Sequence, residues 1–164
     1  MMTDPIPSTP LVGILMGSAS DAELMEPARA ILKEFEIACE FKVLSAHRTP
    51  DQALSYAETA AGRGMHILIA GAGGAAHLPG VLAAKTTLPV IGVPIQSKAL
   101  NGLDSLLSIV QMPSGIPVAT VAINGSANAG LLAVEMLALK YPELVARLNQ
   151  SRERMRQKVL DAKV

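Results

Sequence analysis

The chain alternates short apolar runs with longer segments in which apolar residues recur at helical spacing. Such runs are typical of strands buried on both faces of a sheet, and such segments of the helices that cover those faces. Five runs predict strands, at about residues 11–16, 38–44, 66–70, 90–93 and 118–123. Helices are expected at about residues 20–35, 49–62, 79–85, 103–110 and 127–139, and from Pro142 onward.

Strand-helix alternation with short connections predicts a parallel sheet with helices on both faces. Five strands fit the doubly wound order 2-1-3-4-5, in which ligands bind at the carboxyl ends of strands one and three. The chain has 164 residues, a length that suits one domain with a full core. We expect this domain to span residues 11–164, after a loose leader at residues 1–10 that holds three prolines.

Two helix starts carry capping signals. Ser20 with Glu23 fits a capping box, and Thr49 with Gln52 fits a second one that has Pro50 at the first helical position. Both boxes directly follow a predicted strand. The two helices therefore begin at the edge of the sheet where a ligand is expected.

Charge is balanced overall but unevenly spread. The formal net charge is zero, so composition gives no case for nucleic-acid binding. Between Gly64 and Val134 the only Lys, Arg, Asp or Glu residues are Lys85, Lys98 and Asp104. Buried strands explain part of this shortage, and we expect subunit interfaces to explain the rest, which predicts a homo-oligomer.

Several protein classes find no support in the sequence. Cys39 is the only cysteine, and three scattered histidines give no standard spacing for metal ligands, so neither a disulfide framework nor a metal site is expected. The N-terminus lacks a signal peptide pattern, and no apolar run is long enough to span a membrane. We expect a soluble, cytoplasmic protein with no membrane partner.

Three polar or glycine-rich segments follow predicted strands, at residues 17–21, 45–48 and 71–77. The three strands before them are neighbours in the order 2-1-3-4-5. Because parallel strands end at the same edge of a sheet, the three segments are expected to converge on one site.

The first two segments suggest binding of an anion and transfer of a proton. The turn at Gly17 offers backbone N–H groups and Ser18 a hydroxyl, while Asp21 could accept hydrogen bonds from a sugar or only complement the helix dipole. His47 can move protons near neutral pH, and Arg48 can grip a phosphate or carboxylate. The alternative is a capped helix start with a solvent-facing His-Arg pair.

The third segment lacks bulky side chains. Residues 71–76 carry nothing larger than a methyl group, so their backbone could approach a flat ring closely, although a tight turn would need only one glycine. His77 follows and could line a pocket, whereas His66 begins an apolar strand and is expected to be structural.

These segments match the motifs of a known family. The motifs are MGSASD at 16–21, SAHRTP at 45–50, AGAGGAAHLPG at 70–80, PVIGVP at 89–94 and GLDSLLSIVQMP at 102–113. In this order and spacing they closely resemble the class I N5-carboxyaminoimidazole ribonucleotide mutases of bacterial purine biosynthesis. The resemblance covers about Val12 to Leu139.

The resemblance implies a flavodoxin-like three-layer α/β/α sandwich that assembles as an octamer. It implies conversion of N5-carboxyaminoimidazole ribonucleotide to 4-carboxyaminoimidazole ribonucleotide with neither metal nor organic cofactor. Its site residues would be Ser18, Ser45 and Arg48 for the phosphate, Asp21 for the ribose, His47 as acid and base, and Gly71, Ala72, Gly73, Gly74, His77 and Leu78 around the aminoimidazole and carboxylate. The loop at residues 112–115 would reach the site of a neighbouring subunit.

One position departs from the family pattern. A tryptophan usually follows the serine-aspartate pair, and here the residue is Ala22. Because this position lies in the first helical turn, we expect altered packing near the site and unchanged chemistry.

Other functions are weighed against this one. A carboxylase that uses carbon dioxide directly is the nearest enzyme, but the segment at residues 76–80 resembles the mutases. A flavin carrier commonly stacks aromatic rings on its cofactor, and only two Tyr and two Phe are present. A signalling receiver would need an acidic cluster after the first strand and a lysine after the fifth, and the residues at 17–18 and 123–125 provide neither. A nucleotide-binding module without catalysis is a further alternative.

Overall fold

The computed structural model describes residues 5–162. Five parallel strands form one sheet in the order β2-β1-β3-β4-β5, as the sequence predicts. The strands are β1 (Val12–Met16), β2 (Cys39–Val43), β3 (Ile67–Gly73), β4 (Val90–Ile95) and β5 (Ala119–Thr120).

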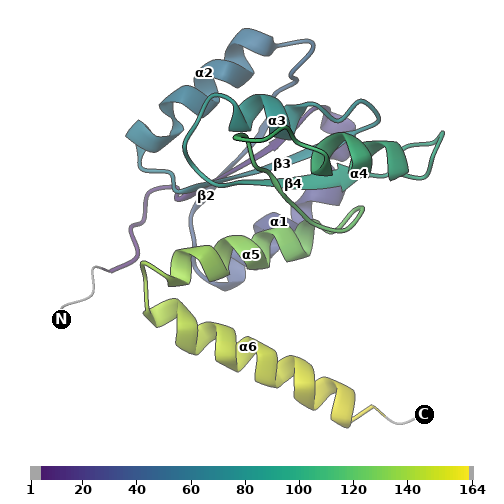
Figure 1. Ribbon diagram of the computed structural model, residues 1–164. Coiled ribbons are helices and arrows are strands. Elements are labelled where there is room, and N and C mark those ends of the chain that lie inside the picture. The colour runs from purple at the N-terminus through teal and green to yellow at the C-terminus, as the bar shows by residue number, and fades with distance from the viewer. Residues whose placement is uncertain (1–4, 163–164) are drawn as a thin grey trace.

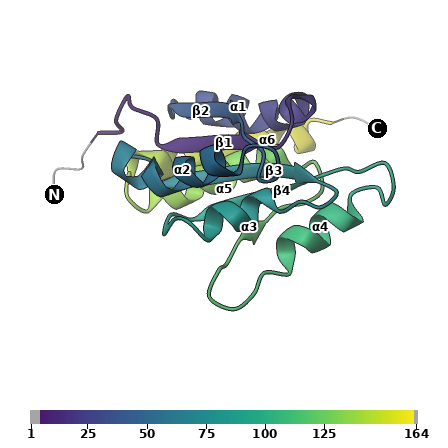
Figure 2. The ribbon, with the colours of Figure 1, turned by 90° about the horizontal axis from the view of Figure 1, so that it is seen from above.

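Helices cover both faces of the sheet (Figures 1 and 2). The helices are α1 (Ala22–Glu34), α2 (Pro50–Ala60), α3 (Leu78–Ala83), α4 (Leu103–Val110), α5 (Ser126–Ala138) and α6 (Glu143–Leu160), with short 3₁₀ turns η1 (Ala19–Asp21) and η2 (Ala61–Arg63). Helices α1 and α5 lie on one face, and α2, α3 and α4 on the other, while α6 packs outside α5 (Figure 1). The fold is therefore the flavodoxin-like α/β sandwich that the sequence implied. No helix within residues 5–162 has the length and apolar character needed to cross a membrane.

Alternation along the strands divides the core into two halves. Ile14 of β1 and Ile69 of β3 are fully buried beneath α1 and α5, whereas Leu15 and Leu68 are fully buried beneath α2 and α3. Every residue of β1 is buried because this strand has neighbours on both sides and helices on both faces.

Three strands differ from the sequence prediction by two residues or more at one end. β4 was expected at residues 90–93 but continues to Ile95, because its last two residues pair with β3. β3 continues to Gly73 because its last three residues pair with β4, where a turn was expected after Ala70.

β5 pairs over only two residues, although a strand was expected at 118–123. Pro94 of β4 turns its carbonyl toward this edge, where it accepts from the N–H of Asn124 (2.8 Å). Because proline has no N–H to donate on the same side, regular pairing ends early.

The first capping prediction was wrong in its position. Ser20 was expected to cap α1, but Ala19–Asp21 form the turn η1 and Ser18 is the residue that caps it. The Ser18 Oγ accepts from the N–H of Ser20 at 3.3 Å. Part of the expected leader, residues 1–4, lies outside the described residues, and so do residues 163–164. The rest of the leader, residues 5–10, forms neither helix nor strand.

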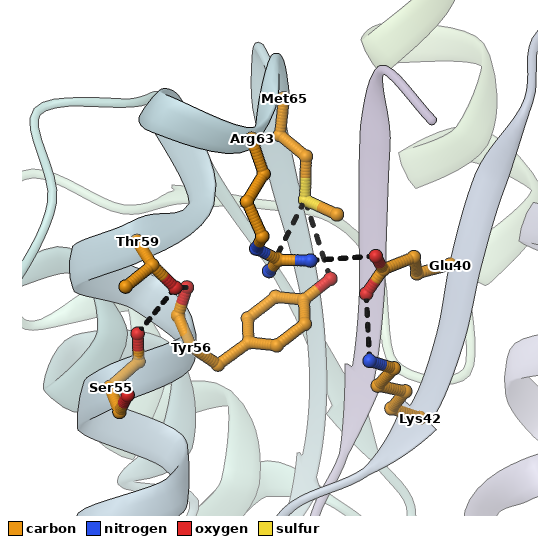
Figure 3. A network of polar contacts seen from close by, with 7 residues as sticks. All are labelled: Glu40, Lys42, Ser55, Tyr56, Thr59, Arg63 and Met65. Carbon is orange, nitrogen blue, oxygen red and sulfur yellow. Dashed lines mark hydrogen bonds and ion pairs between the residues drawn. The ribbon is translucent and has the colours of Figure 1, made fainter. Parts of the chain in front are cut away.

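A buried tyrosine attaches α2 to the edge strand β2 (Figure 3). The ring of Tyr56 is covered by the guanidinium of Arg63, 4.4 Å from the ring centroid, and by the Lys42 ammonium at 5.4 Å. Glu40 pairs with both cations, at 2.6 Å to Arg63 and 3.0 Å to Lys42. The sheet accommodates the phenol only because position 13 is glycine: a Cβ there would lie 2.5 Å from the Tyr56 hydroxyl.

The environment of this cluster shifts two acid groups in opposite directions. Burial raises the pKa of Tyr56, and the adjacent Glu40 carboxylate raises it further, against the smaller opposing effect of Arg63. Burial would also raise the pKa of Glu40, but Lys42, Tyr56 and Arg63 together outweigh it, and that pKa lies below its ordinary value.

The raised pKa of Tyr56 predicts a loss of stability at high pH. The folded chain holds the phenolic proton more tightly than the unfolded chain, whose tyrosine titrates near 10.0. The stabilisation is therefore complete below pH 10 and decreases above it, by up to about 1.4 kcal/mol per pH unit. Urea unfolding between pH 8 and pH 11 should show this decrease in the wild type and a flatter curve for Tyr56→Phe. Parallel curves for the two proteins would contradict the prediction.

Candidate active site

The three segments predicted to converge do so at the carboxyl edge of the sheet. They line one cavity of about 380 Å³. Among its lining residues are nine of the eleven predicted site residues: Ser18, Asp21, Ser45, His47, Arg48, Ala72, Gly73, His77 and Leu78. Gly71 and Gly74 belong to the same segment but do not line the cavity. Gly17, Ala46 and Ala75 also line it; they lie in the three predicted segments but were not among the named site residues.

The first wall is the turn between β1 and α1. Its start is fixed by the N–H of Gly17, which donates to the Gly71 carbonyl at 3.3 Å and extends the β1–β3 ladder by one bond. The Ser20 hydroxyl lies 2.8 Å from the Ser18 Oγ and 3.2 Å from Asp21 Oδ1. This short chain of polar contacts holds the serine and the carboxylate beside each other at the cavity.

The second wall is a loop closed on itself by Thr49. The Thr49 hydroxyl accepts from the N–H of Ser45 (2.8 Å) and donates to the Ser45 carbonyl (3.1 Å). The capping box predicted for Thr49 and Gln52 is wrong in this respect, because Thr49 stands at the N-cap position of α2 but makes no side-chain cap. The hydroxyl instead satisfies both backbone groups of Ser45, and so fixes the loop that presents His47 and Arg48.

Arg48 is available to bind an anion. Its guanidinium donates to the carbonyl of Gly17, and its Nε lies 3.4 Å from the Ser45 hydroxyl. Within residues 5–162, no carboxylate forms an ion pair with it, whereas Arg29, Arg63 and Arg147 are all paired. The positive charge of an arginine that is held only by neutral groups is not neutralised by the protein, so at a cavity wall it can bind a phosphate or carboxylate.

Two histidines meet across the cavity. His47 Nε2 lies 2.8 Å from His77 Nδ1, and the ring planes are nearly perpendicular at 86°. Such a contact needs one nitrogen with a proton and one with a lone pair, so only one proton occupies the space between the rings. His77, one of the predicted site residues, therefore lines the same cavity as His47 and contacts it. His66 lies elsewhere, 2.8 Å from the ammonium of Lys140, and the structure gives it no part in the cavity.

In the third wall, the segment that begins at Gly71, each glycine is explained by a different structural feature. A Cβ at Gly71 would lie 2.4 Å from the sulfur of Met25, so the core side of β3 requires this glycine. Gly74 has φ +64°, which glycine adopts without strain, and the chain leaves the sheet there. Gly73 and Ala72 face the cavity, where their small size leaves the backbone accessible to a flat ring.

The unusual Ala22 lies outside this cavity. It lines a separate apolar hollow of about 640 Å³ with Pro27, Ala30 and Phe41, between α1 and β2. The position therefore adds no group to the site.

Metal ligation finds no support in the geometry. Among the described residues, no three His, Cys, Asp or Glu side chains gather closely enough to hold a metal ion.

Comparison with known proteins agrees with the geometry. The family described as AIR carboxylase matches residues 11–158. The N5-carboxyaminoimidazole ribonucleotide mutase of Pyrococcus abyssi is 64% identical over 147 residues, which cover 90% of this chain and 84% of that protein. The mutase of the same name from Bacillus subtilis is 61% identical over 93% of this chain and 96% of its own.

A solved structure extends the agreement to the fold. The crystal structure of Treponema denticola PurE superposes with a TM-score of 0.83 at 32% identity, covering 93% of this chain and 95% of that one. The resemblance found in the motifs is thereby confirmed across most of the sequence, and the chain belongs to the AIR carboxylase family.

Proposed function

We propose that this protein is the mutase that converts N5-carboxyaminoimidazole ribonucleotide to 4-carboxyaminoimidazole ribonucleotide in purine biosynthesis. The observation that carries the proposal is that one cavity is lined by the His47 imidazole, by Arg48, which pairs with no carboxylate within residues 5–162, and by a wall of glycine and alanine. High identity to enzymes of that name supports the same conclusion.

The substrate is held in three parts. Arg48, Ser18 and Ser45 bind the phosphate, because they supply a guanidinium and two hydroxyls on one side of the cavity. Asp21 accepts hydrogen bonds from the ribose. The aminoimidazole lies along Gly73 and Ala72, with His77 and Leu78 beside it. Binding energy from the distant phosphate thus positions the ring for reaction.

The chemistry requires one proton to be given and one to be taken. His47 protonates the exocyclic nitrogen as its bond to the carboxyl carbon breaks, and carbon dioxide is released into the cavity. The enamine-like ring carbon then forms a bond to carbon dioxide, and neutral His47 removes the hydrogen from that carbon. The imidazole ends in the protonation state in which it began, so one residue serves both steps.

The cavity keeps carbon dioxide beside its acceptor. Ala72, Gly73 and Ala75 form a wall without polar side chains near the two histidines. Because carbon dioxide is confined beside the ring carbon, its addition to that carbon is effectively unimolecular. Its effective concentration there is far higher than that of dilute carbon dioxide in solution.

The name of the family supplies the second candidate, a carboxylase acting on aminoimidazole ribonucleotide and carbon dioxide. Both reactions share the carbon-carboxylation step and need the same base. They differ in whether carbon dioxide comes from the substrate or from solution.

One assay separates these candidates. Purified protein is incubated with N5-carboxyaminoimidazole ribonucleotide, with chelator and without ATP, and formation of the carbon-carboxylated product is followed. Formation well above the spontaneous rate, with little response to bicarbonate, establishes the mutase. Product formed only from aminoimidazole ribonucleotide with bicarbonate would establish the carboxylase, and no product from either would overturn both.

We further propose that the chain is cytoplasmic, that residues 11–164 form one domain and that it assembles as a homo-octamer. The support for assembly is an apolar outer face on and beside α4, where Leu100, Leu103, Leu107 and Val110 are each about half exposed. Four large, half-exposed apolar side chains between residues 100 and 110 are typical of a surface that another subunit covers.

Placing a charge on this face is expected to dissociate the assembly. Leu107→Glu should raise the dissociation constant at least about 100-fold, because an unpaired carboxylate is costly to bury. Sedimentation velocity over a range of protein concentrations measures this directly. Leu139→Glu is the matched control, since Leu139 lies at the end of α5 and not on α4, and is 90% exposed. Unchanged sedimentation of Leu107→Glu would contradict an interface at α4.

A further inference from the structure

The side chain of Ser105 is fully buried on the inner face of α4, yet it is polar. Its hydroxyl donates to the carbonyl of Ile95 at 2.6 Å and accepts from the N–H of Gly74 at 2.8 Å. One hydroxyl thus joins three separate segments: the end of β4, the end of β3 and α4.

The position of this hydroxyl follows from the pairing of β3 with β4. Leu68 is the register partner of Val90, and its N–H donates to the carbonyl one residue earlier, that of Pro89 (3.0 Å). The same pattern, continued to the end of the ladder, would join the N–H of Gly74 to the carbonyl of Ile95. Ser105 stands between those two groups and bonds to each, so it takes the place of the last ladder bond.

This insertion separates the strands where β3 must turn. Gly74 adopts φ +64°, and the next residues fold back tightly: the N–H of Ala76 donates to the Gly74 carbonyl, and the N–H of His77 to the Ala75 carbonyl, both at 2.8 Å. Because each bond spans only two residues, the direction of Gly74 sets the positions of Ala75 and His77.

Ser108 supports the same glycine from one turn further along α4. Its hydroxyl donates to the Asp104 carbonyl at 2.7 Å and lies 3.4 Å from the Gly74 carbonyl. The longer distance makes this the weaker contact. Ser105 is therefore the group that holds the turn.

We propose that Ser105 is a positioning residue, whose hydroxyl replaces the last bond of the β3–β4 ladder and thereby places His77 against His47. It is fully buried and does not line the cavity, so it acts through the turn at residues 74–77. The kinetic consequence rests on the proposed mutase function, whereas the geometric one does not.

Ser126 offers a matched control. It is equally buried, and its hydroxyl also donates to a backbone carbonyl, that of Leu24 at 2.5 Å, but it makes no hydrogen bond to the turn at residues 74–77. Ser105→Ala and Ser126→Ala each delete one buried hydroxyl. A merely structural role for Ser105 would make the two variants behave alike.

Two measurements are made on the folded wild type and both variants. Ring ¹⁵N chemical shifts of His47 and His77 report the hydrogen bond between them. We expect them to change in Ser105→Ala and not in Ser126→Ala. Turnover is expected to fall about 10-fold to 100-fold in Ser105→Ala with little change in KM, because misplacement by about 1 Å can cost that much.

Each outcome has one meaning. Unchanged histidine shifts in Ser105→Ala, or equal losses of turnover in both variants, would overturn the positioning role. An inactive wild type whose histidine shifts still respond to Ser105→Ala would overturn the mutase proposal and support the positioning role. Should Ser105→Ala fail to fold, Ser105→Cys takes its place, since a thiol fills the same space with weaker hydrogen bonding.

Discussion

Replacing His47 with asparagine is expected to lower kcat by about 100-fold to 10,000-fold, the usual contribution of a general acid and base. Asparagine is close to histidine in size and can still donate a hydrogen bond, but it cannot exchange a proton near neutral pH. Because we propose that the phosphate is bound by other residues of the cavity, Arg48, Ser18 and Ser45, KM should change little. Steady-state kinetics with N5-carboxyaminoimidazole ribonucleotide separate these two parameters.

His66→Asn is the control for this experiment. His66 lies outside the cavity, beside Lys140 and Tyr141, so the substitution removes an imidazole without touching the site. It should leave kcat and KM near the wild-type values. A folded His47→Asn protein that retained wild-type kcat, or lost substrate binding instead of turnover, would remove His47 from the role of acid and base.

The sheet and its order were predictable because each strand is marked by a short apolar run in its own segment of the sequence. The runs at 11–16 and 90–93 are apolar throughout, and a run buried on both faces has few alternatives to a parallel strand. The ends of the strands were not predictable. Whether residues 71–73 continue β3 depends on the pairing partner in β4, and whether β5 continues depends on the missing N–H of Pro94, which lies in a different segment of the chain.

The candidate site was predictable to the extent that topology determines it. Three segments that follow neighbouring strands must meet at one edge of the sheet. The convergence of the nine residues that line the cavity could therefore be predicted without knowledge of any contact between distant residues. Roles within a segment were harder to assign. Thr49 carries a helix-start signal that is strong in sequence, but its hydroxyl closes the loop at Ser45 instead, a choice that depends on the exact turn of the backbone.

Which individual groups in distant segments bond to one another lay beyond sequence reasoning. The contact between His47 and His77 spans 30 residues, and the bond from Gly74 to Ser105 spans 31. Helix α4 carries two serines, and only its rotation against the sheet decides that Ser105 points inward while Leu103 and Leu107 remain exposed. One helix thus supports the glycine turn with its inner face and presents an apolar surface with its outer face.

Arg48→Ala is expected to have the opposite kinetic signature to His47→Asn. Loss of the guanidinium removes charge-assisted hydrogen bonds to the phosphate and should raise KM about 100-fold, equivalent to about 2.7 kcal/mol. The chemistry at the aminoimidazole remains, so kcat should fall much less. Arg48→Lys keeps the charge but loses the planar pair of donors, and an intermediate KM, raised about 10-fold, is expected.

Inorganic phosphate provides a second readout that needs no turnover of the variant. It should compete with substrate in the wild type and compete much less in Arg48→Ala, because the arginine that attracts it is gone. The two substitutions stand at adjacent positions of one loop, so a general disturbance of that loop would change kcat and KM alike in both. A rise in KM for Arg48→Ala and a fall in kcat for His47→Asn can only arise if neighbouring residues divide binding and chemistry between them. Equal changes in both parameters for both variants would show that the loop, and not its individual side chains, accounts for the loss.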